Sequence, residues 1–217
     1  PKRCAMMSLE WVSNPIRWLG GLYAYAILTF LLASIWRGTR RPPGQASGRF
    51  AWWLRSLLFY IVATLLFIGA GLLLWQPLPL EQTPEIHAAT LAAGALLYFP
   101  GLTIVLWGRL ALGKMYFVST SQGAQLFAGH ELVTSGPYAV VRHPMYLGLI
   151  LAALGGLLIY QTWTMAVFSL IAPFVLLRTR REESVLAVTF GEQWQDYCSR
   201  VPALLPRLWR KRENDDQ

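Results

Sequence analysis

The stretch MYLGLILAALGGLLIYQTWTMAVFSLIAPFVLL (residues 145–177) decides the fold of this chain. A helix needs about 20 mostly apolar residues to cross the hydrocarbon core of a bilayer, so this stretch is too long for one span. The polar residues YQTW (160–163) interrupt it near the middle. We therefore expect two membrane helices that form a tight hairpin, each shorter than usual or tilted.

Further apolar stretches precede the hairpin, at residues Trp18–Trp36, Ser56–Trp75 and His87–Leu112. Pro100 lies in the last of them and is expected to kink its helix, because proline removes a backbone donor. The chain is 55% hydrophobic and 14% charged, whereas soluble domains carry about 25% charged residues. The sequence predicts an all-α polytopic integral membrane protein with about five spans. Three spans fall in residues 1–112, and the hairpin falls in a C-terminal part of residues 113–217.

Loop charges predict the orientation. The segment 37–55 contains five arginines and no acidic residue, while QPLPLEQTPEIH (76–87) contains two glutamates and no Lys or Arg. By the positive-inside rule the first segment is cytoplasmic and the second is external. The N-terminus is then outside, and both ends of the hairpin face the cytoplasm, across the inner or plasma membrane if the source is prokaryotic. The net charge of +8 suits contact with anionic membrane lipids better than nucleic acid.

The tail REESVLAVTFGEQWQDYCSRVPALLP (181–206) carries an apolar stripe. The stripe residues recur at three- and four-residue spacing, which is typical of an amphipathic helix: Leu186, Phe190, Trp194, Tyr197 and Val201. Gly191 interrupts this helix. Two alternatives stay open, since the stripe suits either the membrane surface or packing against the cytoplasmic face of the bundle.

Few residues could do chemistry. The His, Cys, Asp and Glu residues have no metal-ligand spacing, so we expect no metal site. The segment GHELVTSGPYAVVRHPMYLG (129–148) ends where the hairpin begins. Gly136-Pro137 indicates a turn, and Pro144 suits the first turn of the next helix. Arg142 and His143 should therefore lie at a helix N-terminus, whose positive end favours anions.

The second polar segment is LLRTRREES (176–184), directly after the hairpin. Because the two ends of a hairpin are neighbours, Glu182 and Glu183 should lie close to Arg142 and His143. Each residue alone has a simpler explanation in topology or helix-surface pairing. Together they predict a pocket with charges of both signs, edged by tyrosines, that suits a zwitterion such as S-adenosylmethionine. These residue types alone do not single out that ligand.

The two segments, in this order and separated by a membrane hairpin, resemble the isoprenylcysteine carboxyl methyltransferase family. These are integral membrane methyltransferases related to phospholipid N-methyltransferases, and the resemblance covers residues 114–206. It implies that residues 113–217 are the catalytic part and that S-adenosylmethionine is the cofactor. It also implies a lipophilic or lipidated acceptor that enters from the bilayer. The cofactor-binding residues implied by the resemblance are His130, Tyr138, His143, Tyr146, Glu182 and Glu183. Arg142 and Arg178 are implied to orient the acceptor, with Arg181 as the alternative to Arg178.

The nature of the acceptor stays open between several chemistries. We expect carboxyl O-methylation of an isoprenylcysteine-like molecule, because a carboxylate with a pKa of about 4 is already ionised and needs no base. A phospholipid such as phosphatidylethanolamine, a small amine or a thiol is the alternative, and an amine must first lose a proton. A non-catalytic transporter or assembly factor is an alternative of another class. It predicts charges inside the spans, of which Arg109 is the example.

Overall fold

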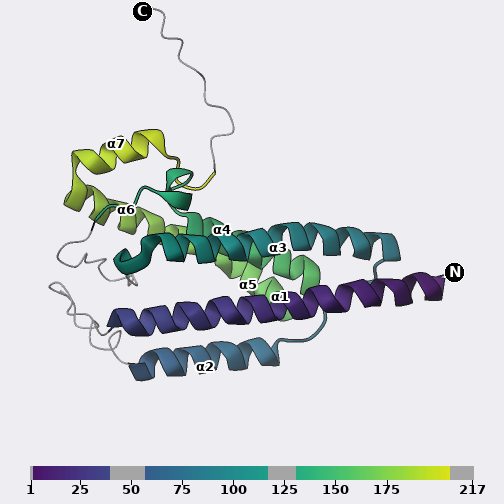
Figure 1. Cartoon of the computed structure of the whole chain (residues 1–217). Helices are drawn as coiled ribbons and strands as arrows, with labels where there is room; N and C mark the ends of the chain where they lie inside the picture. The colour runs from purple at the N-terminus through teal and green to yellow at the C-terminus, as the bar shows by residue number, and fades with distance from the viewer. Residues whose placement is uncertain (1, 40–56, 117–130, 206–217) are drawn as a thin grey trace, which may run out of the picture.

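The structure, a computed structural model, describes residues 2–39, 57–116 and 131–205 of the 217-residue chain. The α-helices are α1 (Lys2–Thr39), α2 (Leu57–Leu73), α3 (Pro84–Leu112), α4 (Pro144–Tyr160), α5 (Trp163–Ile171), α6 (Leu176–Phe190) and α7 (Glu192–Arg200). The short 3-10 helices are η2 (Gly113–Met115), η3 (Gly136–Ala139) and η4 (Ala172–Val175). In the described ranges the other regular element is a single bridge between Pro77 and Thr162. The predicted all-α fold is confirmed, with α1 to α5 running alongside one another and α7 at one end (Figure 1).

The apolar helices match the predicted spans in number. Three stretches are long and apolar enough to cross a membrane, Trp11–Ile35, Pro84–Met115 and Trp163–Phe190, and two shorter apolar helices cover Ile61–Leu73 and Pro144–Tyr160. The helix α3 continues through Pro100 to Leu112. The last span does not end at residue 177 as expected, because α5, η4 and α6 follow one another directly. The acidic pair therefore lies on a helix that continues directly from the membrane hairpin.

The predicted break at residues 160–163 is confirmed. The helix α4 ends at Tyr160, and Gln161 adopts a left-handed conformation with φ of 51°. The hydroxyl of Thr162 then caps α5 by accepting a hydrogen bond from the Met165 backbone N–H at 3.4 Å. The Ser169 hydroxyl donates to the Ala153 carbonyl at 2.7 Å. The hairpin is thus fixed both at its turn and between its arms.

Glycines bring α3 and α4 into backbone contact, and this interface places the candidate site. A Cβ added at Gly155 would lie 2.4 Å from the Tyr98 backbone nitrogen, and one at Gly101 would lie 2.5 Å from the Ala152 nitrogen. Lipid gives no hydrophobic drive for helix association, so such close van der Waals packing holds membrane helices together. The start of α4 is therefore held beside the end of α3.

The far end of α4 is tied to α1. The Arg17 Nε donates to the Ile159 carbonyl at 3.1 Å, and the Tyr160 hydroxyl donates to the Arg17 carbonyl at 2.8 Å. The Tyr98 hydroxyl donates to the Gly20 carbonyl at 3.3 Å. The first bond satisfies a carbonyl near the C-terminus of α4, and the three bonds together fix α1 on the α3–α4 pair.

The apolar stripe of the tail lies on two helices that pack against each other. Gly191 has φ of 51° and ψ of −121°, a conformation that favours glycine, and it separates α6 from α7. The buried side chains Trp194, Tyr197 and Val201 form a cluster, and partly buried residues of α6 and Leu132 pack on it. The membrane-surface alternative is wrong for these residues, because their side chains are buried within the protein. The structure shows packing within the tail and against Leu132, and packing against the cytoplasmic face of the bundle stays a prediction.

Candidate active site

The segment before α4 is anchored by backbone hydrogen bonds to the segment after α7. The Arg142 N–H donates to the Pro202 carbonyl at 2.9 Å, and the His143 N–H donates to the Ala203 carbonyl at 3.0 Å. His143 is the residue that precedes α4, and Pro144 is the first residue of that helix. The predicted position of Arg142 and His143 at a helix N-terminus is confirmed. The predicted turn at Gly136-Pro137 is also confirmed, as the start of η3.

Glu183 joins the two halves of the sequence motif. Its Oε1 accepts a hydrogen bond from Arg142 Nε at 3.0 Å, forms an ion pair with Arg142 Nη2 at 2.9 Å, and lies 2.9 Å from His143 Nε2. The predicted proximity is confirmed, although these partners lie 40 and 41 positions away in sequence. Within the described residues, no hydrogen bond reaches the other carboxylate oxygen of Glu183, and the side chain is 27% exposed. A carboxylate held through one oxygen can therefore offer the second oxygen to a ligand.

Arg142 does more than pair with Glu183. Its Nη1 donates to the carbonyls of Cys198 at 3.3 Å and Val201 at 3.1 Å, at the C-terminus of α7. Its guanidinium carbon lies 5.8 Å from the centre of the Trp194 ring. A cation suits a helix C-terminus, where carbonyls lack intrahelical partners. Arg142 thus fastens α7 and Glu183 together, and its predicted role in orienting an acceptor stays a prediction.

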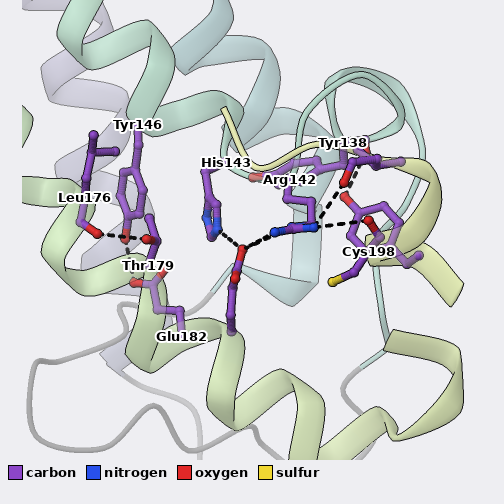
Figure 2. A network of polar contacts seen from close by, with 11 residues as sticks. Tyr138, Arg142, His143, Tyr146, Leu176, Thr179, Glu182 and Cys198 are labelled. Carbon is purple, nitrogen blue, oxygen red and sulfur yellow. Dashed lines mark hydrogen bonds and ion pairs between the residues drawn. The ribbon is translucent and has the colours of Figure 1, made fainter. Parts of the chain in front are cut away.

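The other carboxylate of the pair has different partners. The Tyr146 hydroxyl donates to Glu182 Oε1 at 2.5 Å, and Figure 2 shows this pair beside Thr179 and separate from Arg142. The Tyr146 ring lies nearly parallel to the His143 ring, 5.6 Å away at an angle of 10°. Two adjacent glutamates on α6 therefore serve two different parts of one polar site.

The remaining predicted residues divide into three groups. Tyr138 is buried on η3, where its carbonyl accepts from the Tyr197 hydroxyl at 2.7 Å. Burial raises the pKa of Tyr138 above its ordinary value and raises that of Tyr197 to about 12, so both phenols are protonated at neutral pH. Arg178 is half-buried and interacts electrostatically with Tyr146, whereas Arg181 is exposed. His130 lies outside the described residues.

The described residues offer no set of three or more His, Cys, Asp or Glu side chains able to hold a metal ion. They bring together three groups: the Glu183 carboxylate held by Arg142 and His143, the Tyr146–Glu182 pair, and the half-buried Arg178. Sequence reasoning missed the carbonyls of Pro202 and Ala203, because a backbone acceptor has no residue-type signature. The one sequence signal was Pro202 itself, which marks where α7 must stop.

The reactivity of the Cys198 thiol depends on the burial and the charge near this site. Burial raises the pKa of its thiol, and the nearby Arg142 guanidinium opposes that rise. A raised pKa leaves less thiolate at neutral pH, and the thiolate is the nucleophile. In protein whose Cys4 is replaced by serine, we expect iodoacetamide to modify Cys198 more slowly than a free cysteine peptide. Alkylation rates measured against pH provide the check, and a midpoint at or below about 8.5 would contradict the expectation.

Helical spans that are long and apolar enough to cross a membrane, with a polar cluster at one end of a helical hairpin, define a class, that of polytopic integral membrane proteins. Residues 89–193 match the family model described as phospholipid methyltransferase. The chain is 30% identical over 186 residues to methanethiol S-methyltransferase 2 of Bradyrhizobium diazoefficiens, covering 76% of this chain and 68% of the relative. This chain belongs to the family of membrane methyltransferases that includes the phospholipid and isoprenylcysteine enzymes, and it is a methyltransferase. The predicted resemblance is confirmed.

Other relatives differ in their names and coverage. The rat protein-S-isoprenylcysteine O-methyltransferase is 29% identical over 157 residues, which is 68% of this chain and 54% of the relative. The chain thus spans about half the length of that relative. A cobalt-zinc-cadmium resistance protein, CzcN of Cupriavidus metallidurans, is 42% identical over 86 residues, 36% of this chain.

Proposed function

We propose that this protein transfers the methyl group of S-adenosylmethionine to a lipophilic acceptor at the site where α4 begins. The observation that carries the proposal is the geometry of Glu183. Arg142 and His143 hold one of its carboxylate oxygens, and the second oxygen is left for a ligand. Such a preorganised carboxylate beside aromatic and basic groups suits a ligand that carries both signs of charge.

The residues at the site fit S-adenosylmethionine in chemical type. Glu183 can accept hydrogen bonds from its ammonium or its ribose diol. Tyr138 and Tyr146 supply electron-rich rings and oxygens for the sulfonium, beside the negative charge of Glu182. Arg178 supplies a positive charge for the carboxylate of the acceptor. His130 keeps its proposed cofactor role on the resemblance alone.

The chemistry requires little from the protein beyond placement. The lone pair of the acceptor forms a bond to the methyl carbon while the carbon–sulfur bond breaks. The electron pair of the broken bond stays on sulfur, which becomes a neutral thioether. This in-line displacement depends on alignment of the two reactants and on the electrostatics around the sulfonium. Glu183 and the Tyr146–Glu182 pair would hold the donor, and α3 and α4 would line the approach from the bilayer. We further propose that this end of the bundle faces the cytoplasm, because the arginine-rich segment 37–55 favours that side.

The leading acceptor is the carboxylate of an isoprenylcysteine-like molecule, which is ionised at neutral pH and needs an arginine rather than a base. Arg178 is the arginine that we propose for this task. A hydrophobic thiol is the second candidate, favoured by two observations. Relatives named methanethiol S-methyltransferase match more than two thirds of this chain. In addition, His143 is paired with Glu183, an arrangement that supports proton acceptance from a thiol.

The test is a methylation assay with purified protein, labelled S-adenosylmethionine and a panel of prenylcysteine, thiol and phospholipid acceptors. Mild base releases label from a methyl ester but not from a thioether or an N-methyl group. We expect base-labile label on the prenylcysteine. Base-stable label on the thiol alone would support the second candidate instead, and transfer to no member of the panel would contradict the proposed function. An Arg178→Met variant should lose transfer to the carboxylate while keeping cofactor binding.

A further inference from the structure

The second arm of the hairpin carries a line of exposed apolar side chains that ends at a cation. The arm consists of α5, η4 and α6, which follow one another directly. Ile171, Phe174 and Arg178 recur at three- and four-residue spacing along it, so they share one face of the arm. Ile171 is 56% exposed and Phe174 is 62% exposed. We call these three residues the track.

One end of the track lies at the candidate site. Arg178 is half-buried on α6, and Glu182 follows it by four residues. Residues four apart are neighbours on a helix surface. The Glu182 carboxylate in turn accepts the hydrogen bond from the Tyr146 hydroxyl on α4. A molecule that lies on the track therefore meets the Arg178 cation, and one helical turn later it meets the Tyr146–Glu182 pair.

The helix α2 marks the other end of the track. The Thr164 hydroxyl donates to the Gly71 carbonyl at 2.6 Å, and the Thr164 N–H donates to the Leu74 carbonyl at 3.1 Å. Four residues after Thr164, the Phe168 ring meets the Phe67 ring edge to face, with the ring centres 6.4 Å apart and an angle of 70°. These contacts pin α2 to the arm beside the hairpin turn, and from there the arm runs away from α2 toward α6 (Figure 1).

We propose that the track binds the hydrocarbon chain of the methyl acceptor, and that the Phe67–Phe168 contact sets the longest chain that the enzyme accepts. The inference rests on the proposed function and deepens it, because it names the residues that select the acceptor. The charge of Arg178 favours an anionic head group at the end of the chain. The head group lies at the site against α4, and the chain extends from there along η4 and α5.

The spacing of Phe168 and Arg178 gives the track a length. Ten residues separate them, and a helix rises about 1.5 Å per residue, so the track is about 15 Å long. An extended chain of about a dozen carbons has that length, because each carbon–carbon bond is about 1.5 Å long and the chain zigzags. A farnesyl chain fits this length. A geranylgeranyl chain is one isoprene unit longer, and a geranyl chain is one unit shorter.

The experiment measures kcat/KM of the purified full chain in detergent for S-geranyl, S-farnesyl and S-geranylgeranyl acceptors with the same carboxylate head group. For wild type we expect the geranylgeranyl acceptor to be used at least about tenfold less well than the farnesyl acceptor, because its last unit would have to displace the two rings. Phe168→Ala should raise kcat/KM for the geranylgeranyl acceptor at least about fivefold and change that for the farnesyl acceptor by less than about twofold.

Two further variants and a control make the test specific. Phe67→Ala should have the same effect as Phe168→Ala, and Phe67 is 64% exposed, so this variant keeps the test sharp if Phe168→Ala unfolds. Ile171→Trp adds bulk in the middle of the track and should lower kcat/KM for the farnesyl acceptor at least about fivefold, while the geranyl acceptor is spared. The matched control is Leu66→Ala, since Leu66 is 68% exposed on α2, and it should match wild type.

The outcomes separate the inference from the function beneath it. If wild type uses the farnesyl and geranylgeranyl acceptors equally, or if neither phenylalanine variant gains the longer one, the inference is overturned. A track that holds only membrane lipid would give the same acceptor profile in every variant, which also overturns it. Transfer to small thiols alone would overturn the inference and leave methyl transfer intact. If wild type does not bind S-adenosylmethionine, the proposed function fails and the inference falls with it.

Discussion

Replacing Gly155 by alanine is expected to destabilise the helix bundle by about 3 kcal/mol or more, at the upper end of overpacking effects. A methyl group at this position would lie 2.4 Å from the Tyr98 nitrogen and 2.7 Å from the Gly94 carbonyl oxygen. Both obstacles are backbone atoms, so neither can swing aside as a side chain can. The helices α3 and α4 would have to separate, and the start of α4 would move with them.

Thermal unfolding in detergent checks this prediction, with Gly69→Ala as the matched control. Gly69 lies on the apolar helix α2, and a Cβ there meets no atom within 4 Å. The same substitution in an open position should be neutral or slightly stabilising, because alanine favours helix over glycine by roughly 0.5–1 kcal/mol. Equal melting temperatures for the two variants would show that the glycine contact does not hold the bundle together.

Replacing Arg142 by methionine should loosen α7 from the site, while the backbone hydrogen bonds to the Pro202 and Ala203 carbonyls remain. The substitution removes the donors to Glu183 and to the carbonyls of Cys198 and Val201, while the apolar stem is kept. Removal of one partner from a buried ion pair costs about 3–5 kcal/mol. Arg142 is 14% exposed and Glu183 is 27% exposed, so we expect a smaller cost of about 2 kcal/mol here.

Hydrogen–deuterium exchange measures this loosening directly. In the Arg142→Met variant, amides of α7 should exchange about tenfold faster or more, because the local opening free energy falls. The matched control is Arg200→Met. Arg200 also pairs with a carboxylate, that of Asp196, but both side chains are more than 60% exposed, and exposed pairs contribute little. Similar exchange in the two variants would contradict the role of Arg142 as the fastener of α7.

The sequence was sufficient to predict the hairpin and the meeting of its two polar ends. A long apolar run with a polar break can fold back only near that break, so the proximity of the acidic pair to Arg142 and His143 follows from topology. Which of the two glutamates, Glu182 or Glu183, pairs with Arg142 could not be predicted in this way. It depends on the rotation of α6 about its axis, which is set by packing against α7 and η4.

Two other features had weak signals or none. Gly94, Gly101 and Gly108 recur every seven residues in α3 and could have indicated a close helix interface. Their partners on α4, Gly148 and Gly155, are also seven apart. By contrast, the guanidinium carbon of Arg109 lies 4.2 Å from the centre of the Tyr116 ring, and this contact depends on how the chain turns after α3. The reversal at Gly191 was visible as an interruption, but the side on which α7 returns was not.

The central claim is that Glu183 anchors S-adenosylmethionine, and equilibrium binding by isothermal titration tests it most directly. Glutamine at position 183 keeps an oxygen for Arg142 and His143 but removes the negative charge that the ligand would meet. The control is Glu192→Gln, since Glu192 is exposed at the start of α7. We predict that wild type and Glu192→Gln bind the cofactor alike, and that Glu183→Gln binds it at least about tenfold more weakly. Equal affinity of Glu183→Gln and wild type, or no binding by wild type, would contradict the account.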